Sequence, residues 1–392
     1  MRFPGFKDKW KEKAIENMAE ISSGGTPSRT NASYWNGNIP WVSTSLIDFN
    51  IIHYTDERIT EEGLKKSSAK LFPKGSLLMA MYGQGKTRGK VAVLGIEAST
   101  NQACASIIPN SNYIDSLFLF QNLSKRYEEI RELSNQGGQQ NLSGTIIKGI
   151  RVKFPTLPEQ KKIAAFLTLI DERIETQNKI IEKLESLSKA FKVNVFNRRL
   201  QFKDDDGNDF ADWNWKLGNT LFENVSDKNH NSDLPILAIT QEHGAIPRHM
   251  IDYNISVSDK SIESYKVVQK GDFIISLRSF QGGIEFSNYE GICSPAYIVL
   301  RPIREVNPNF FRLYFKTTGY IKRLTRNLEG IRDGKMISFK YFSEVTLPTP
   351  SIEEQTKITN FLSFIERKIE TERNVLARYE NQKYYLLQTM FI

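Results

Sequence analysis

A short basic stretch in the first third of the chain holds the residues best suited to bind phosphate. The motif Ala80-x-x-x-x-Gly85-Lys86-Thr87 follows an apolar, strand-like run and satisfies a relaxed phosphate-loop pattern. A phosphate loop that holds a nucleotide needs a helix directly after it, because the first amides of that helix face the phosphates. Here Val91–Leu94 follow, which indicates a turn into a second strand. We therefore expect contacts to DNA backbone phosphates from Lys86, Thr87, Arg88 and Lys90.

Other segments carry the side chains that read base edges. Residues 135–143 and 330–336 combine amides or basic side chains with glycine, and residues 23–29 combine glycine with hydroxyls and an arginine. Gln and Asn can bond adenine through two atoms and Arg can bond guanine, while glycine lets the backbone approach a ligand. The DNA contacts predicted here, and just after the strand-like run 273–277, are Thr26, Ser28, Arg29, Gln136, Gln139, Gln140, Asn141, Arg278, Gln281, Arg332 and Lys335. Ordinary polar loops would fit the segments 23–29, 135–143 and 330–336 equally well.

No group of residues forms a recognisable catalytic centre. An adenine methyltransferase would show an Asn/Asp-Pro-Pro-aromatic motif. The nearest segment, Asn307-Pro308-Asn309-Phe310, lacks the second proline and is expected to begin a helix. No histidine has a cysteine or histidine neighbour at metal-ligand spacing. The sequence therefore predicts no catalytic residue, no bound cofactor and no metal site.

Composition is compatible with a polyanionic partner. The 392 residues contain 53 Lys and Arg against 45 Asp and Glu, a formal charge of +8, and such an excess fits nucleic acid without requiring it. The two cysteines, Cys104 and Cys293, form no disulfide framework or zinc pattern, so we expect a reducing, cytoplasmic location. No apolar run is long enough for a transmembrane helix, so we expect no membrane association.

The chain repeats part of itself at an offset of 195 residues. Glu159–Leu167 matches Glu354–Leu362, and the residues 159–185 contain 11 identities in 27 positions at that offset. Between the repeated segments the two halves differ almost completely. An internal repeat implies that the same structural unit occurs twice, so the repeated parts should do one job and the differing parts two.

Each repeated segment has the pattern of a long helix. Prolines precede it, and neither proline nor glycine occurs from 159 to 199 or from 351 to 392. Steps of four and three from Ile163, and likewise from Ile358, meet apolar residues at seven of nine positions, which is a coiled-coil seam. Two independent amphipathic helices would also fit, but matched seams favour an antiparallel pair within one chain.

The variable segments read as α+β domains, with short strand-like runs followed by helical stretches. The predicted fold is therefore two globular α+β domains, each followed by a long helix, with the helices paired as an antiparallel coiled coil of pseudo-twofold symmetry. The predicted divisions are a first globular domain over 1–154, a spacer helix over 155–200, a second globular domain over 201–347 and a second spacer helix over 348–392.

This layout resembles the specificity subunit of type I restriction–modification systems over the whole chain. The motifs that carry the resemblance are Ser23-Gly24-Gly25-Thr26-Pro27, Asn141-Leu142-Ser143 ahead of Pro155, and the Glu-Gln-x-x-Ile signatures at Glu159 and Glu354. Each motif is weak alone, but their order, doubled near half-length, is specific.

The resemblance implies a role for each part. Each variable domain would recognise one half of a split, asymmetric sequence in double-stranded DNA, and the helices would set the gap between the half-sites. The subunit would lack catalytic residues and would dock two methyltransferase subunits and two ATP-dependent restriction and translocase subunits. S-adenosylmethionine, ATP and Mg would belong to those partners.

Three other functions remain open on the sequence alone. The first is a self-contained DNA methyltransferase or nuclease, which the missing motifs argue against. The second is a coiled-coil scaffold that binds only protein. The third is a nucleotide hydrolase that uses the relaxed phosphate loop. For the basic residues of that loop, the alternative to contact with phosphate is a solvated turn with no binding role.

Overall fold

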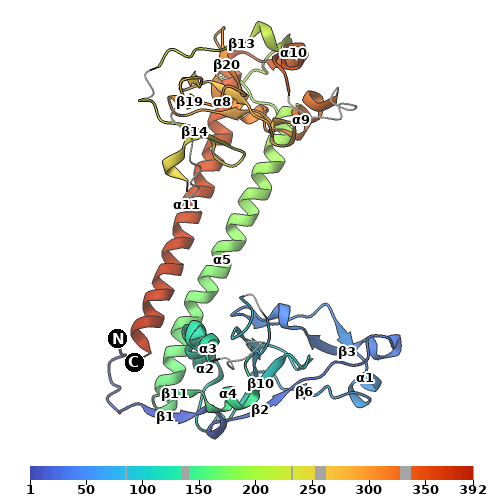
Figure 1. Ribbon diagram of the computed structural model, residues 1–392, viewed down its shortest axis with the longest axis vertical. Coiled ribbons are helices and arrows are strands. Elements are labelled where there is room, and N and C mark those ends of the chain that lie inside the picture. Colours follow the sequence, from blue (N-terminus) through green and yellow to red (C-terminus); the bar gives the residue numbers. More distant parts are fainter. Residues whose placement is uncertain (84–85, 134–140, 231–232, 252–261, 327–336, 392) are drawn as a thin grey trace. The chain divides into compact units, whose positions relative to one another are not determined.

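The computed structural model of the protein describes residues 1–83, 86–133, 141–230, 233–251, 262–326 and 337–391. Its chain divides into two compact units, one of residues 1–179 with 374–392 and the other of residues 180–373. Two long helices, α5 (Leu157–Phe196) and α11 (Ile352–Met390), each contribute one part to either unit (Figure 1). Each globular domain is followed by one of these helices, which confirms the predicted α+β fold class.

The first globular domain contains two main sheets. One has the strand order β2 (Ala19–Ser23), β10 (Cys104–Pro109), β7 (Leu77–Ala80), β8 (Val91–Leu94) and β4 (Ile51–Ile52). The other has the order β5 (Arg58–Ile59), β3 (Trp35–Val42), β9 (Ala98–Thr100) and β6 (Leu71–Phe72). A separate pair, β1 (Lys11–Ala14) and β11 (Arg151–Phe154), leads into α5. The helices are α1 (Glu61–Lys65), α2 (Ser116–Lys125), α3 (Tyr127–Glu132) and α4 (Gly144–Gly149).

The second globular domain repeats the central part of this plan. Its main sheet has the order β13 (Phe222–Val225), β20 (Ile298–Pro302), β17 (Phe273–Ile275) and β18 (Glu285–Phe286). Three two-stranded pairs accompany it: β12 (Asn214–Leu217) with β21 (Thr346–Thr349), β14 (Leu237–Thr240) with β15 (Gly244–Pro247), and β16 (Lys266–Val268) with β19 (Gly291–Cys293). The helices are α7 (Ser279–Gly282), α8 (Pro308–Tyr314), α9 (Thr318–Thr325) and α10 (Phe339–Glu344).

Each domain shares its hydrophobic core with a long helix. In the first unit, Phe118 of α2 packs in one buried cluster with Ile163 and Leu167 of α5. In the second unit, Phe310 of α8 packs with Ile358 and Leu362 of α11 in the same way. Both pairs of helix residues belong to the predicted seam, so the first turns of each long helix serve the domain core as well as the helix pair.

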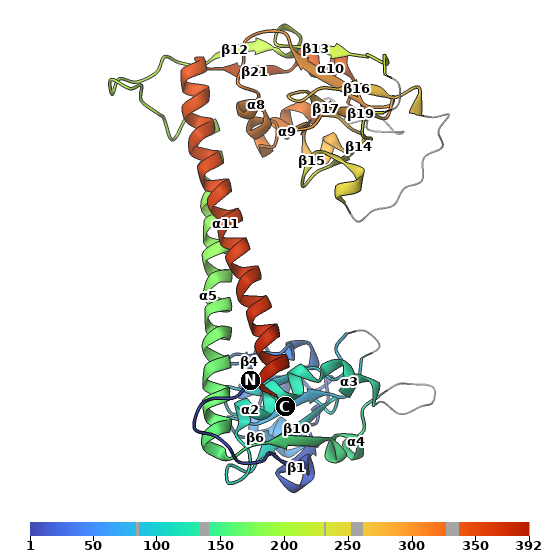
Figure 2. The same ribbon diagram turned by 90° about the vertical axis from the view of Figure 1, so that its left-hand side faces the viewer.

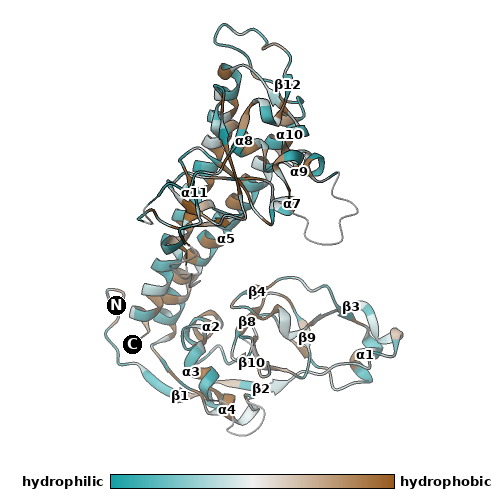
Figure 3. Cartoon of the chain, turned by 45° about the horizontal axis from the view of Figure 1, so that its top comes forward, coloured by the Kyte–Doolittle hydropathy of each residue, from teal (hydrophilic) through white to brown (hydrophobic). Residues whose placement is uncertain are grey.

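Within both units the two helices run side by side and antiparallel (Figures 1 and 2). Asp171 pairs with Lys383 at 2.6 Å in the first unit, and Glu185 pairs with Arg373 at 2.6 Å in the second. Residue numbers fall along α11 as they rise along α5, as antiparallel packing requires. Hydrophobic and hydrophilic residues alternate along both helices in Figure 3. Every predicted seam position is buried or half-buried, including the polar steps Gln177 and Ser188.

Candidate nucleic-acid interface

Segments predicted to contact DNA gather at one edge of the first domain's five-stranded sheet. Ser23, at the end of β2, lies opposite Ala105 of β10, and Ala80, at the end of β7, lies opposite Cys104. Antiparallel pairing therefore brings the start of segment 24–29 and the β7–β8 turn out at the same edge, and Gly25 then contacts Thr100 and Trp41 of the second sheet. The backbone N–H of Leu142 donates to the carbonyl of Met81 at 2.9 Å, which places Asn141 there too.

The β7–β8 connection is a hairpin, as predicted, and not a phosphate loop. Leu77 pairs with Val93 and Met79 with Val91 in antiparallel register, and no helix occurs in residues 81–83 or 86–90. Because a phosphate loop requires a helix at this point, the geometry disfavours nucleotide hydrolysis here.

The four basic or polar residues of this hairpin have different environments. Lys86 is exposed, and its carbonyl accepts a hydrogen bond from the hydroxyl of Tyr127. Thr87 is half-buried. Arg88 is only 7% exposed, so its side chain lies inside the domain and not on its surface. Lys90 forms an ion pair with Asp48. Lys86 is therefore the hairpin cation best placed to meet a phosphate.

The segment 23–29 is fixed by contacts within the protein. A Cβ on Gly24 would lie 2.0 Å from the carbonyl oxygen of Thr100, so a side chain has no room there. Gly24 thus lets the backbone pack closely against another part of the protein. From the sequence alone, the glycines of this segment are expected to allow close approach to a ligand. Thr26 donates to Gln102 at 2.6 Å, and the hydroxyls of Ser28 and Thr30 lie 2.8 Å apart.

Arg29 is also engaged within the domain. Its guanidinium pairs with Glu57 and lies over the rings of Trp35 and Trp41, 3.8 and 4.9 Å from their centroids. Cation–π stacking and the ion pair hold this guanidinium in one place, while the arginine side chain remains 53% exposed.

The second domain builds an equivalent edge on its main sheet. Val225, at the end of β13, lies opposite Val299 of β20, and Ile275, at the end of β17, lies opposite Ile298. The segment after β17, which carries Arg278 and Gln281, therefore leaves the sheet where the β7–β8 hairpin does in the first domain. Both side chains are exposed.

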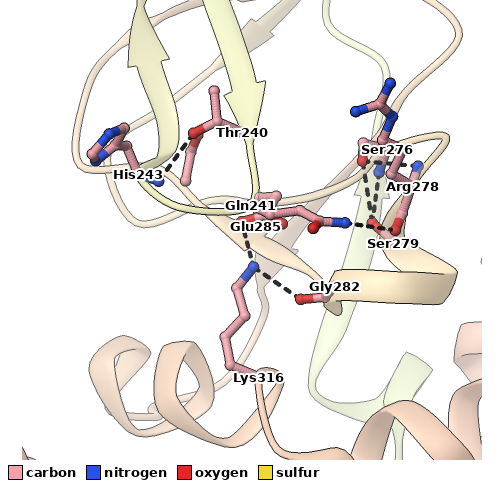
Figure 4. Close-up of polar contacts among 10 residues, drawn as sticks. Thr240, Gln241, His243, Ser276, Arg278, Ser279, Gly282, Glu285 and Lys316 are labelled. Atoms are coloured by element: carbon pink, nitrogen blue, oxygen red, sulfur yellow. Dashed lines mark hydrogen bonds and ion pairs between the residues drawn. The ribbon is translucent and has the colours of Figure 1, made fainter. Parts of the chain in front are cut away.

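A buried framework supports the loop that carries Arg278 (Figure 4). The N–H of Ser276 donates to the hydroxyl of Ser279 at 2.9 Å, and Ser279 is 1% exposed. The carbonyl of Arg278 accepts from the N–H of Gln281 at 2.9 Å and from the side-chain amide of Gln241 at 3.5 Å. The backbone is thus fixed, while the guanidinium of Arg278 points away from these contacts in Figure 4.

An ion pair holds the far end of the same loop. Lys316 Nζ lies 2.6 Å from Glu285 Oε2 and donates to the carbonyl of Gly282 at 3.0 Å. Burial raises the pKa of Glu285, and the charge of Lys316 opposes that rise. A Cβ on Gly282 would lie 2.5 Å from Gln241, so this position must stay glycine for Gln241 to reach Arg278.

Arg278 differs from other arginines of its domain. Arg301 makes two hydrogen bonds to Asp272, at 2.9 and 2.7 Å, and Arg312 bonds Glu366 at 2.8 Å. Among the described residues, no hydrogen bond or ion pair is found for the guanidinium of Arg278. A fixed backbone with a free guanidinium is the arrangement that a base-reading arginine needs.

Some predicted contacts cannot be placed, and some candidates were missed. Residues outside the described part of the chain include Gln136, Gln139, Gln140, Arg332 and Lys335. Gln241 and His243, both in the β14–β15 turn, were not selected from the sequence. Gln241 reaches the carbonyl of Arg278, and the backbone of His243 bonds Thr240 (Figure 4). It also passed over Tyr82, which is 43% exposed next to the first hairpin. Hairpin turns and exposed aromatic residues at sheet edges are the signal that could have found them.

Metal-ligand clusters and membrane-spanning helices are both absent from the described residues. In those ranges, no group of three or more His, Cys, Asp or Glu side chains could hold a metal ion. Likewise, none of the helices described there combines the length and apolar character needed to cross a bilayer.

Comparison with known proteins identifies the repeat. A family model described as the type I restriction modification DNA specificity domain matches residues 7–186 and again residues 208–381. The putative MjaX specificity subunit of Methanocaldococcus jannaschii is 25% identical over 398 residues, which cover 95% of this chain and 91% of that protein. The MjaIX specificity subunit from the same organism is 32% identical over 185 residues, 45% of this chain and 41% of that protein.

Solved structures share the fold. A type I restriction–modification S subunit from M. genitalium aligns over 100% of this chain and 97% of its own, with a TM-score of 0.60 and 15% identity. A chain from a structural study of complex assembly and conformational transition in a type I system aligns over 98% of both chains, with a TM-score of 0.59 and 18% identity. At these identities the structures support the fold alone.

Proposed function

We propose, from the premise that this chain belongs to the type I restriction modification DNA specificity family, that each of its domains reads one half of a bipartite DNA site. Specificity subunits are the non-catalytic, DNA-recognising members of these systems, so the chain itself performs no chemical step. The sequence that it selects would be asymmetric, because its two variable domains differ.

The observation that supports this proposal is the pair of equivalent sheet edges. Both place a segment after a central strand, β7 or β17, next to the start of the neighbouring strand, β10 or β20. The side chains carried there differ: Tyr82 and Lys86 in the first domain, Arg278 and Gln281 in the second. Since each side-chain type favours different base or backbone atoms, one scaffold used twice would recognise two different half-sites.

The long helices would set the gap between the half-sites. The helix α5 contains 40 residues and α11 contains 39, and at about 1.5 Å per residue each is about 60 Å long. Ion pairs between the two helices occur in both units. We infer that helices held in register in this way would be stiff enough to act as a spacer.

The catalytic work would belong to partners. We propose that the chain binds two methyltransferase subunits and, for cleavage, two ATP-dependent restriction and translocase subunits, in the cytoplasm. S-adenosylmethionine, ATP and Mg would be bound by those subunits. Alone, a chain with a formal charge of only +8 should bind DNA weakly and with strong salt dependence, and the methyltransferase subunits should tighten that binding.

Mapping methylated adenines in cells with and without the chain tests the proposal. We expect a gapped motif that disappears when the chain is deleted. Replacing residues 201–347 by the corresponding domain of a relative should change one half of that motif and leave the other half intact. A continuous motif, or a motif unaffected by deletion, would overturn the proposal, and methyl transfer by the purified chain alone would show that it is an enzyme.

A further inference from the structure

We propose that Gln160 and Gln355 are positioning residues that fix the angle at which each reading domain is mounted on its long helix, and that they thereby restrict the complex to a single gap length. This inference rests on the proposed function, because it concerns the spacing of the two half-sites. It assigns a role to the glutamine of the doubled Glu-Gln signature.

Gln160 lies in the first turn of α5 and is fully buried. Its side-chain oxygen accepts a hydrogen bond of 2.8 Å from the backbone N–H of Asp115, the residue that caps the start of α2. Its side-chain nitrogen donates to the carbonyls of Tyr113, at 3.0 Å, and Pro155, at 2.9 Å. One planar amide therefore joins the long helix to the start of a domain helix and to the strand end that leads into α5.

Gln355 makes the corresponding contacts in the second unit. It is 2% exposed. Its side-chain oxygen accepts a hydrogen bond of 2.9 Å from the backbone N–H of Asn307, the residue that caps α8. Its nitrogen donates to the carbonyl of Pro350 at 2.9 Å. The two domains differ in sequence, yet in each the amide bonds the N-cap residue of the helix that packs on the long helix.

The geometry of these bonds controls orientation more than it controls adhesion. Hydrophobic packing of Phe118 or Phe310 holds each domain helix against its long helix, and such packing has little directional preference. Hydrogen bonds are directional, and they weaken steeply when the angle departs from linearity. A buried amide bonded to two elements at once therefore resists rotation of the domain about its helix.

Rotation matters because DNA is helical. At about 10.5 base pairs per turn, a gap changed by one base pair rotates one half-site by about 34° relative to the other. A mount that allowed rotation of that order would accept neighbouring gap lengths. Rigid mounting of both domains is thus a condition for reading one gap only.

The test measures gap selectivity in cells that contain the partner subunits. A plasmid pool carries both half-sites separated by the normal gap, or by one base pair more or fewer, and the methylated fraction is read for each. In Gln355→Ala we expect methylation at the altered gaps to rise about tenfold relative to the wild-type chain, as the loss of one or two directional hydrogen bonds allows. Base preference within both half-sites should stay unchanged.

Matched variants separate this role from folding. Gln160→Ala should have the same effect through the first domain. Gln355→Met, which removes both hydrogen bonds but keeps the length of the side chain, should have the same effect as Gln355→Ala. Asn360→Ala, which removes an exposed amide five residues along the same helix, should leave gap selectivity unchanged.

The outcomes separate the two proposals. If the wild-type chain shows no preference for one gap, the proposed function itself fails. If the wild type prefers one gap and Gln355→Ala retains that preference, the positioning role is overturned. If Gln355→Ala loses methylation at every gap together with its cooperative thermal unfolding, Gln355 is a folding residue, which also overturns the proposal.

Discussion

The two domains join their long helices through similar contacts but differ at the sheet edges that we propose to read DNA. In the first unit, buried Glu159 accepts hydrogen bonds of 2.7 and 2.8 Å from Arg2. In the second, buried Glu354 accepts one of 2.8 Å from Arg198. In both units, the arginine belongs to the segment that leads into the domain, and the carboxylate begins the helix that leads out of it. The reading edges show no such correspondence, since a hairpin in one domain corresponds to a loop and the short helix α7 in the other.

This difference separates two kinds of constraint. The contacts that join each domain to its long helix, which we call the mount, are made by Glu159 and Gln160 in one unit and by Glu354 and Gln355 in the other. Both domains pack on the same pair of helices, so the mount must have the same geometry twice, and its polar contacts are repeated. The reader must have a different chemistry in each domain if the half-sites are to differ. Since Gln160 and Gln355 bond backbone atoms of Asp115 and Asn307 and none of the proposed reading residues, those reading residues can be replaced without removing these hydrogen bonds.

The largest effect should come from lengthening the helices. Seven residues inserted within 178–189 of α5, together with seven within 368–378 of α11, keep the seam in phase because the seam repeats every seven residues. Each helix then gains about 10 Å, which is about three base pairs at 3.4 Å each. We expect methylation to move to a gap about three base pairs longer and to cease at the original site.

An insertion into α5 alone is the control for that experiment. It would place the facing ion pairs out of register, including Glu185 with Arg373, and should abolish methylation at every gap. Methylation of the original target by the doubly lengthened chain would contradict the role of the helices as a spacer.

Much of this architecture could be predicted from sequence because its signals are local. The seven-residue period and the prolines ahead of Glu159 and Glu354 predicted both long helices, and α5 and α11 confirm them. The hydrogen bond between Gln160 and Asp115 could not be predicted, because the sequence around Asp115 has no matching motif in the second half of the chain. The burial of Arg88 and the ion pair of Lys90 also depend on tertiary neighbours that a basic motif does not reveal.

Breaking a mounting ion pair should have the next largest effect. In Arg198→Ala, the carboxylate of Glu354, which is 1% exposed, loses its cation, and an unpaired buried charge costs about 3 kcal/mol. Thermal unfolding followed by circular dichroism should show a lowered midpoint. Arg2→Ala should lower it at least as far, because Arg2 reaches both oxygens of Glu159. Arg199→Ala, which removes an exposed arginine, is the control, and an equal loss in all three variants would contradict a specific mount.

Removing the free arginine should act on the reader alone. In Arg278→Ala we expect one base position of a single half-site to become relaxed, because a two-atom contact from arginine to guanine contributes about 1–3 kcal/mol of discrimination. Adenine methylation mapping would show the change. Arg304→Ala, in an exposed residue just after the other end of β20, should change nothing. Uniformly weaker methylation with unchanged base preference would instead assign Arg278 to a phosphate.

The carboxylate of Glu366, which joins α11 to α5 and α8, should make the free energy of unfolding depend on pH. Glu366 pairs with Lys192 of α5 and Arg312 of α8, both at 2.8 Å. Burial alone would raise the pKa of Glu366, but the two cations together hold it below its usual value. The stabilisation is therefore fully present above the pKa of an unfolded glutamate and is lost as pH falls through the lowered pKa. Thermal unfolding measured across acidic pH should show this loss in the wild type and not in Glu366→Gln.

The smallest effect should come from the exposed cation of the first reader. Lys86 lies on the β7–β8 hairpin, where its ammonium can meet a phosphate but reads no base. Lys86→Ala should weaken DNA binding of the assembled complex to a similar extent for all sequences, and the slope of log affinity against log salt should fall by about one. Binding titrations at several salt concentrations, on cognate and scrambled DNA, measure both quantities. If Lys86→Ala instead relaxed one base of a half-site, the first reader would use its hairpin lysine as the second uses Arg278, and the proposed contrast between the two edges would be wrong.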